Sequence, residues 1–233
     1  MGLAEFFLRH RIEILQATGE HIWLTGVSMA FAIAIGVPLG VLVTRKPWLS
    51  KPVIGGANVA ETIPSLALFG FLLPIPWLGD RAGRLAIVAL TLYALLPIIR
   101  NTAAGIANVD PAVLEAARGM GMTGRQILWR VELPLSISTI IAGIRIATVL
   151  TIGIATIAAA VGAGGLGEFI FRGLAMVDNR LILAGAIPAA LLAIFADVLL
   201  GLLERGLRPG AFRARSGRRT STVTPRIAGP AES

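Results

Sequence analysis

The residue types that carry most enzyme chemistry are scarce in this chain of 233 residues. It has no cysteine, and its two histidines, His10 and His21, lie before or at the start of the first long apolar run. Neither a thiolate nucleophile nor a serine–histidine pair is therefore expected. Its two lysines, Lys46 and Lys51, do not follow a glycine, which excludes the Gly-Lys-Ser/Thr loop that holds ATP phosphates. We expect no catalytic residue, no metal site and no cofactor bound by this chain.

Residues 162–167, with the sequence GAGGLG, match the G-x-G-x-x-G spacing of dinucleotide-binding loops. That chemistry needs a strand before the glycines, a helix after them and an acidic residue about 20 positions further on. A long apolar run precedes these glycines instead. We interpret residues 162–167 as an outer loop or a tight bend where helices pack closely.

The segment 108–133 contains the most informative spacing in the chain. Asp110, followed by a proline, is typical of a helix N-cap and first helical position, and Gly121 would follow the end of a short helix. Thr123 can cap a second short helix before Pro134 begins the next apolar run. A helix–glycine–helix unit of this kind can dock into a groove of a soluble partner, although an ordinary connecting loop has the same shape.

The same segment resembles the EAA signature of ABC-importer permeases, which reads EAA-x3-G-x9-I-x-L-P. Val131 replaces the isoleucine with another β-branched residue, and the matching residues are Glu115, Ala116, Ala117, Gly121, Leu133 and Pro134. In that family the segment is the coupling helix that docks on a separate ATPase subunit. The resemblance implies that these residues couple the chain to an ATPase that binds ATP and Mg²⁺.

The resemblance covers about residues 20–203, and several motifs look like the osmoprotectant branch, whose members import glycine betaine, carnitine, choline or related solutes. These motifs are residues 36–40, 62–67, 96–102, 143–145, 162–167 and 183–188. The resemblance implies the type I permease architecture, a second permease subunit in a homodimer or heterodimer, and an extracytoplasmic substrate-binding protein. Two alternatives stay open: an importer of another small solute, such as an amino acid, or an ion-coupled secondary transporter.

Long apolar helices must position these segments. The chain is 55% hydrophobic with a mean hydropathy of +0.80, and only 15% of its residues are charged. We predict an all-α membrane protein in which residues 1–20 form a surface helix, 21–203 the membrane domain and 204–233 a basic, disordered tail. The five expected spans are residues 22–44, 57–77, 84–104, 134–160 and 181–203.

The distribution of lysine and arginine predicts the orientation of these spans. Of the 21 cationic residues, three lie between spans 1 and 2, four between spans 3 and 4, and seven after span 5. The compartment that holds these 14 residues should be the cytoplasm, with the N-terminus outside the plasma (inner) membrane of a bacterium. The net charge of +8 then follows from topology and contact with the lipid bilayer, and we expect no nucleic-acid partner.

Ionisable residues and prolines inside the spans are the candidates for a translocation path. Arg145 would lie within the fourth span, where it needs a partner or water. Glu61 is the partner that the sequence suggests. We assign little functional weight to Asp197. Prolines in spans 2 and 3 predict broken helices beside a cavity, which would make spans 2, 3 and 4 the pore lining. The candidate path or gating residues are Glu61, Pro64, Ser65, Pro97 and Arg145.

Overall fold

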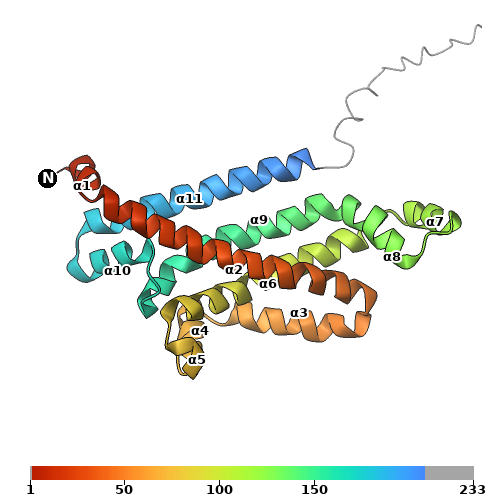
Figure 1. The fold of residues 1–233 in the computed structure, drawn as a ribbon, viewed down its shortest axis with the longest axis horizontal. Coiled ribbons are helices and arrows are strands. Elements are labelled where there is room, and N and C mark those ends of the chain that lie inside the picture. Colours follow the sequence, from red (N-terminus) through yellow and green to blue (C-terminus); the bar gives the residue numbers. More distant parts are fainter. Residues whose placement is uncertain (1, 208–233) are drawn as a thin grey trace, which may run out of the picture.

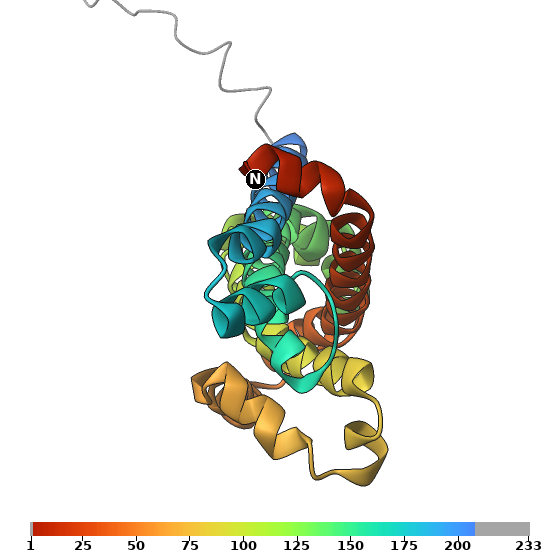
Figure 2. The same cartoon turned by 90° about the vertical axis from the view of Figure 1, so that its left-hand side faces the viewer.

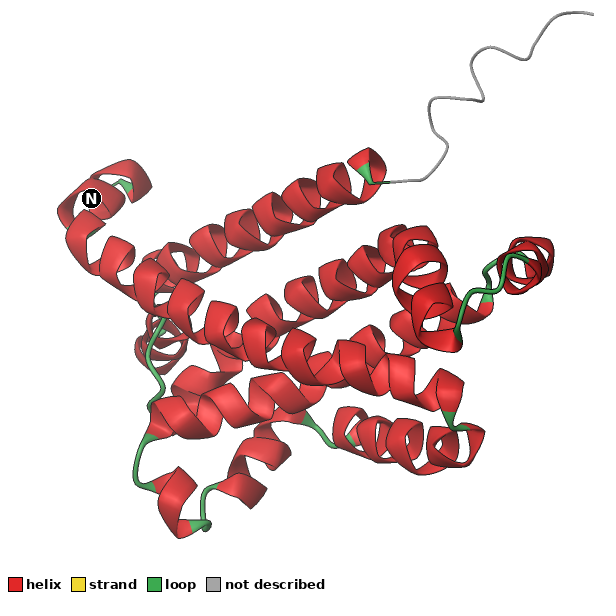
Figure 3. Ribbon diagram, turned by 45° about the vertical axis from the view of Figure 1, so that its right-hand side comes forward, coloured by secondary structure: helices red, strands yellow, loops and turns green. Residues whose placement is uncertain are grey.

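The computed structural model describes residues 2–207, and these residues form helices joined by short turns (Figures 1 and 3). No strand occurs in this part of the chain. The helices are α1 (Leu3–Arg9), α2 (Arg11–Arg45), α3 (Pro47–Thr62), α4 (Ser65–Leu72), α5 (Pro76–Gly79), α6 (Ala82–Ala107), α7 (Pro111–Gly119), α8 (Gly124–Ile127), α9 (Leu133–Ala158), α10 (Gly167–Met176) and α11 (Asn179–Gly206). A π-helical turn (Leu128–Glu132) joins α8 to α9, and a 3-10 turn (Ala159–Val161) follows α9.

Helix α6 occupies the centre of the bundle, with α2 and α9 as its main neighbours. Glycines on both neighbours permit this packing. A Cβ atom at Gly40 of α2 would lie 2.5 Å from Cβ of Thr102, and one at Gly143 of α9 would lie 2.5 Å from Cβ of Asn101. Small residues allow such close helix contacts in a membrane protein. Gly36, four residues before Gly40, lies against Ile98, so both glycines of α2 face α6.

The largest buried cluster joins α6 to helix α4 and the C-terminal end of α9. Its members include Leu68, Phe69, Leu85, Leu90, Tyr93, Ala155 and Ala158. Burial of about 25 cal/mol for each Å² of apolar surface stabilises contacts of this kind against water. In lipid, the same contacts depend more on close van der Waals packing, which the alanines of α6 and α9 allow.

The expected second span is broken rather than continuous. Helix α3 begins at Pro47, ten residues before the predicted start at 57, and the axes of α3 and α4 differ by 103°. Ile63 has the extended backbone that a following proline imposes, and its carbonyl accepts a hydrogen bond from the hydroxyl of Tyr93. Figure 2 shows α3, α4 and α5 set to one side of the main bundle. The break predicted at Pro64 is confirmed.

Other boundaries also differ from the sequence expectation. Helix α2 begins at Arg11, so the separate N-terminal helix is limited to α1. Pro97 lies buried inside a continuous α6 and does not interrupt it, which corrects the expectation for the third span. The tail predicted for 204–233 begins later, because α11 extends to Gly206; its residues from 208 onward lie outside the described part.

Four helical runs within residues 2–207 are long and apolar enough to cross a bilayer: Arg11–Arg45, Ala82–Ala107, Gly124–Val161 and Asn179–Gly206. The bent pair α3–α4 gives a fifth crossing only if its two halves together form one span. The number of spans and the outside position of the N-terminus stay predictions.

Candidate functional site

The segment that matches the EAA pattern forms its own small helical unit at one end of the bundle (Figure 1). Asp110 caps α7, because its carboxylate accepts a hydrogen bond from the backbone N–H of Ala112 at 2.9 Å. Thr123 forms a capping box with Gln126: the Gln126 side chain accepts from the Thr123 N–H at 2.8 Å. Both predicted caps are confirmed.

Gly121 ends this unit's first helix for a specific geometric reason. Its φ of +77° places it in the left-handed region, which side chains with a Cβ disfavour. The N–H of Gly121 donates to the Arg118 carbonyl at 2.9 Å, and the N–H of Met122 donates to the Ala117 carbonyl at 3.1 Å. This pair of bonds is a Schellman motif with glycine at the residue after the C-cap. The glycine of the EAA pattern is therefore required by the turn.

Helix α7 is largely exposed on this structure. Ala117 is its one buried residue, whereas Glu115 and Ala116 are exposed, Val113 is 41% exposed and the adjoining Met120 is 75% exposed. An acidic residue, small residues and apolar side chains thus share a surface that the rest of the described chain does not cover. Leu133 and Pro134, the last residues of the pattern, lie at the start of α9 and are partly buried and exposed, respectively.

The helix does not stop between the coupling pattern and the membrane. The run Gly124–Val161 continues through Pro134, and the π-helical turn Leu128–Glu132 lies immediately before this proline. Proline has no N–H to donate to the preceding turn, and a wider π turn is one way a helix accommodates local disruption. A displacement of α8 can therefore reach α9 through one continuous helix.

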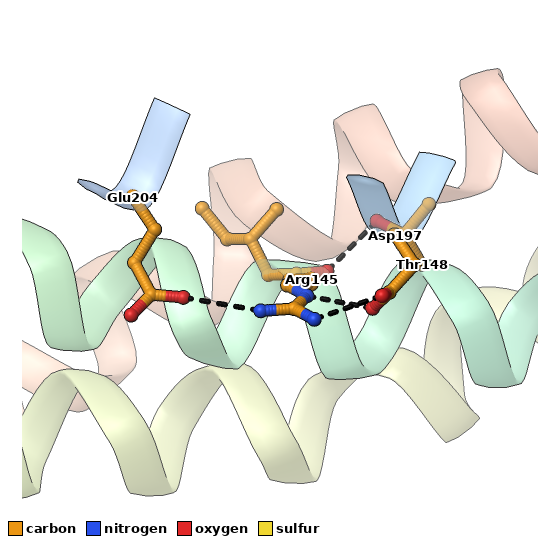
Figure 4. Close-up of polar contacts among 5 residues, drawn as sticks. Arg145, Thr148, Asp197 and Glu204 are labelled. Atoms are coloured by element: carbon orange, nitrogen blue, oxygen red, sulfur yellow. Dashed lines mark hydrogen bonds and ion pairs between the residues drawn. The ribbon is translucent and has the colours of Figure 1, made fainter. Parts of the chain in front are cut away.

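Arg145 lies between two carboxylates of α11 (Figure 4). Its Nε and one terminal nitrogen donate to the two oxygens of Asp197 at 2.6 and 2.8 Å, and its other terminal nitrogen donates to Glu204 at 3.4 Å. The bidentate contact matches the planar guanidinium to a carboxylate. Glu61 is exposed on α3, so the predicted Arg145–Glu61 pair is wrong.

Gly201 gives the arginine its place against α11. A Cβ atom there would lie 3.2 Å from the guanidinium carbon. Asp197, Gly201 and Glu204 are spaced by four and three residues, so they share one helix face. That spacing was a signal that the sequence interpretation missed. A hollow of about 330 Å³ between α9 and α11 is bordered by Arg145, Asp197 and Glu204, and Ile146 and Leu150 are among its apolar lining residues.

The remaining path candidates lie apart from this cluster. Glu61, Pro64 and Ser65 lie at or next to the break between α3 and α4, and the first two are exposed. Pro97 is buried in α6, where its carbonyl accepts a hydrogen bond from Asn101 at 2.8 Å and faces Gly143. The structure therefore does not bring Pro97 or Glu61 close to Arg145.

The glycine-rich residues 162–167 form a tight bend between α9 and α10. Gly162, Gly164 and Gly165 all have positive φ, and the N–H of Gly165 donates to Glu20 at 3.0 Å. A helix and a 3-10 turn precede the bend, not the strand that a dinucleotide loop requires. No cluster of three metal-ligating side chains occurs among residues 2–207. The packing interpretation of this motif is confirmed.

Comparisons with known proteins agree with this arrangement. Residues 32–209 match the family model described as "Binding-protein-dependent transport system inner membrane component". The chain is 45% identical over 217 residues to the carnitine transport permease protein OpuCB of Listeria monocytogenes, covering 93% of this chain and 98% of that protein. It is 43% identical to the osmoprotectant import permease protein OsmW of Salmonella typhimurium, covering 91% and 100%.

Solved structures show a similar fold. A chain of the MetNI methionine ABC transporter in an inward-facing conformation superposes with a TM-score of 0.75 and 26% sequence identity. The match covers 83% of this chain and 95% of that one.

Proposed function

This chain belongs to the family of binding-protein-dependent transport system inner membrane components, and we propose that the solutes it helps to import are osmoprotectants. It is the permease subunit of an ABC importer, a transport component rather than an enzyme. Relatives that are 40–45% identical are named as permeases for carnitine, choline or glycine betaine. These names support this substrate class. We place the protein in the inner membrane of a bacterium.

The coupling role belongs to α7 and the turn that follows it. The single observation that carries this proposal is an EAA-pattern helix with its own caps and an uncovered surface. A helix that is closed at both ends by local hydrogen bonds can be displaced as a unit. Glu115, Ala116 and the neighbouring apolar side chains would contact the ATPase, while Gly121 fixes the angle at which the chain returns to the membrane.

Several partners complete the importer. A permease of this family works with an ATPase, a substrate-binding protein and a second permease. The ATPase would bind ATP and Mg²⁺, since this chain has no Gly-Lys-Ser/Thr loop. A quaternary ammonium is best held by an aromatic cage, and this chain has one tyrosine and four tryptophans among 233 residues. Tight solute capture therefore fits the extracytoplasmic binding protein.

The charged cluster supports a place for the translocation path. One arginine faces two carboxylates, and Arg145 and Asp197 keep a third or more of their side chains exposed. A charged residue at membrane depth costs ~2.5–3.5 kcal/mol on insertion scales and usually faces a water-filled cavity or the interior of a bundle. We infer that this face of α9 and α11 borders an aqueous path between two permease subunits, which opens by alternating access.

Reconstitution tests both proposals in one assay. The permease is purified with its ATPase and binding protein, inserted into liposomes, and supplied with labelled glycine betaine, carnitine or choline. We expect uptake that requires ATP and the binding protein. Glu115→Lys should reduce uptake at least tenfold, about 1.4 kcal/mol of coupling, and weaken ATPase association. Uptake driven by an ion gradient without ATP would contradict the importer assignment.

The same liposomes test the path. Because the chain has no cysteine, Ile146→Cys introduces a single thiol into this permease on the exposed face of α9. A membrane-impermeant thiol reagent should slow uptake by this variant and leave the unsubstituted chain unaffected. A thiol that fails to react in any nucleotide state would place this face in lipid and overturn the path assignment.

A further inference from the structure

Helix α2 runs the length of the bundle but is not adjacent to the coupling unit along the chain, because α3 to α6 lie between them (Figure 1). Helix α9 follows α8 directly through the π-helical turn, and α6 precedes α7 by a short turn. Displacing α7 and α8 therefore pulls on α6 and α9 through the backbone. Helix α2 can follow that displacement only through its packing against α6 and α9 and through contacts with the segment before α9.

One ion pair joins the end of α2 to the segment before α9. The guanidinium of Arg45, the last residue of α2, contacts the carboxylate of Glu132, the last residue of the π-helical turn. Glu132 is only 5% exposed, whereas the side chain of Arg45 is 40% exposed. A buried carboxylate needs a cationic partner, because an unpaired charge is strongly disfavoured away from water.

The surroundings strengthen this contact. An apolar groove of about 390 Å³ lies beside the pair, between α2 and the start of α9, with Leu42, Leu128, Trp129 and Leu133 among its lining residues. Charge pairs interact more strongly where little water is present. The carboxylate also lies at the end of a π-helical turn, a feature often found at functional positions. In the EAA pattern Glu132 occupies the unspecified position before Leu133, so the pattern assigns it no role.

We propose that the Arg45–Glu132 ion pair is the link through which the coupling segment moves helix α2. Arg45 and Glu132 are positioning residues: neither needs to touch the solute or ATP. The inference rests on the proposed coupling of this chain to an ATPase. When the pair is intact, α2 moves together with the α8–α9 run. The outer and inner openings of the translocation path then change at the same time. When it is broken, α9 still moves and ATP is hydrolysed, but α2 lags behind.

The test measures solute imported per ATP hydrolysed by the complete complex in liposomes. Arg45→Ala and Glu132→Gln should each lower this ratio about fivefold or more, the lower end of typical coupling between sites. The double exchange Arg45→Glu with Glu132→Arg should restore at least half of it. Lys46→Ala, which removes the neighbouring exposed cation, is the matched control and should leave the ratio unchanged.

Two results would overturn the link. The first is a ratio within twofold of the unsubstituted complex in both single variants. The second is a double exchange no better than the single variants, since a true pair tolerates reversal. If the single variants fail to assemble, the double exchange decides: recovery of assembly and ratio supports the link, and failure of either one overturns it. Failure of the unsubstituted complex to import would instead contradict the proposed function.

Discussion

Two glycine-containing turns lie at opposite ends of the bundle, and they are held in different ways. In the coupling segment, residues 108–132, the helix caps and the turn at Gly121 are formed by hydrogen bonds among its own residues, and its last residue, Glu132, pairs with Arg45 of α2. The second turn, residues 159–167, which we call the outer bend after its predicted side of the membrane, is fixed by contacts with α2, α9 and α11. In Figure 1 the first turn projects from one end of the bundle and the second lies at the other end, beside α10.

The glycines of the two turns show this difference most clearly. In the coupling segment, Cβ atoms added at Gly119, Gly121 or Gly124 would meet no atom within 4 Å. In the outer bend, a Cβ at Gly167 would overlap the carbonyl of Thr156, and one at Gly165 would lie 3.2 Å from the ring of His21. Space around a turn leaves it available to a partner, whereas the close contacts at Gly165 and Gly167 make the second half of the outer bend part of the fold.

Polar contacts at the outer bend and beside it join segments that are distant in the sequence. The carboxylate of Glu20 accepts from the Gly165 N–H, and the ring of His21 lies fully buried with its Nε2 3.1 Å from the Ile152 carbonyl. Breaking the bend would therefore remove the contact between Glu20 of α2 and the segment that leads into α10. Breaking the coupling segment would change how a partner binds while the bundle stays folded.

Replacing Gly167 by valine should have the largest effect. The added side chain overlaps the backbone of α9, which cannot shift without moving the bend, and we expect a loss of about 3 kcal/mol in the free energy of unfolding. Gly119→Ala in the coupling segment is the control, with a change of less than about 1 kcal/mol. Thermal unfolding in detergent measures both. Equal stability of the two variants would remove the distinction between the turns.

Replacing Gly121 by alanine should have an intermediate effect on stability. The left-handed backbone costs a residue with a Cβ about 1–2 kcal/mol, so α7 should end differently and present Glu115 to the ATPase at another angle. Gly121→Asn is the control, because asparagine tolerates this conformation better. The affinity of the variant for the isolated ATPase measures the effect of this change in the angle of α7. Affinity that falls equally for both variants would point to the side chain rather than the backbone angle.

Removing one cap should have the smallest effect. Thr123→Ala deletes an N-cap hydroxyl, worth about 1 kcal/mol, and Thr123→Ser retains it. Hydrogen exchange at residues 124–127 should speed up in the alanine variant only, and the unfolding temperature of the bundle should stay within a few degrees. A large fall in that temperature would show that the coupling segment is not self-contained.

Local features of the coupling segment were predictable because neighbouring residues produce them. Asp110 and Thr123 cap helices through bonds to backbone groups two and three residues away, and Gly121 occupies the turn that those helix ends create. The break at Pro64 was predictable for the same reason, since a proline restricts the residue before it. Pro97 had the same local signal, but packing against α2 and α9 keeps α6 continuous around it.

Contacts between distant residues could not be derived from composition or spacing. Within the predicted spans Arg145 has two acidic residues as possible partners, Glu61 and Asp197. Glu61 was chosen, whereas the structure pairs Arg145 with Asp197 and with Glu204, which follows the fifth predicted span. Glu132 and Arg45 are separated by 87 positions, and both were assigned only to loops near the membrane. Choosing among such partners requires knowing which helices are neighbours.

The sequence by itself determined the helical membrane class, the coupling motif with its caps and turn, and the family, because these depend on residue type, short-range hydrogen bonds and spacing along the chain. Only the tertiary structure decided that α6 lies at the centre, that α3 and α4 bend apart, and which charges pair across α2, α9 and α11. Apolar spans look alike in composition, so their arrangement depends on close packing at a few glycines and on the few charges that must find partners away from water.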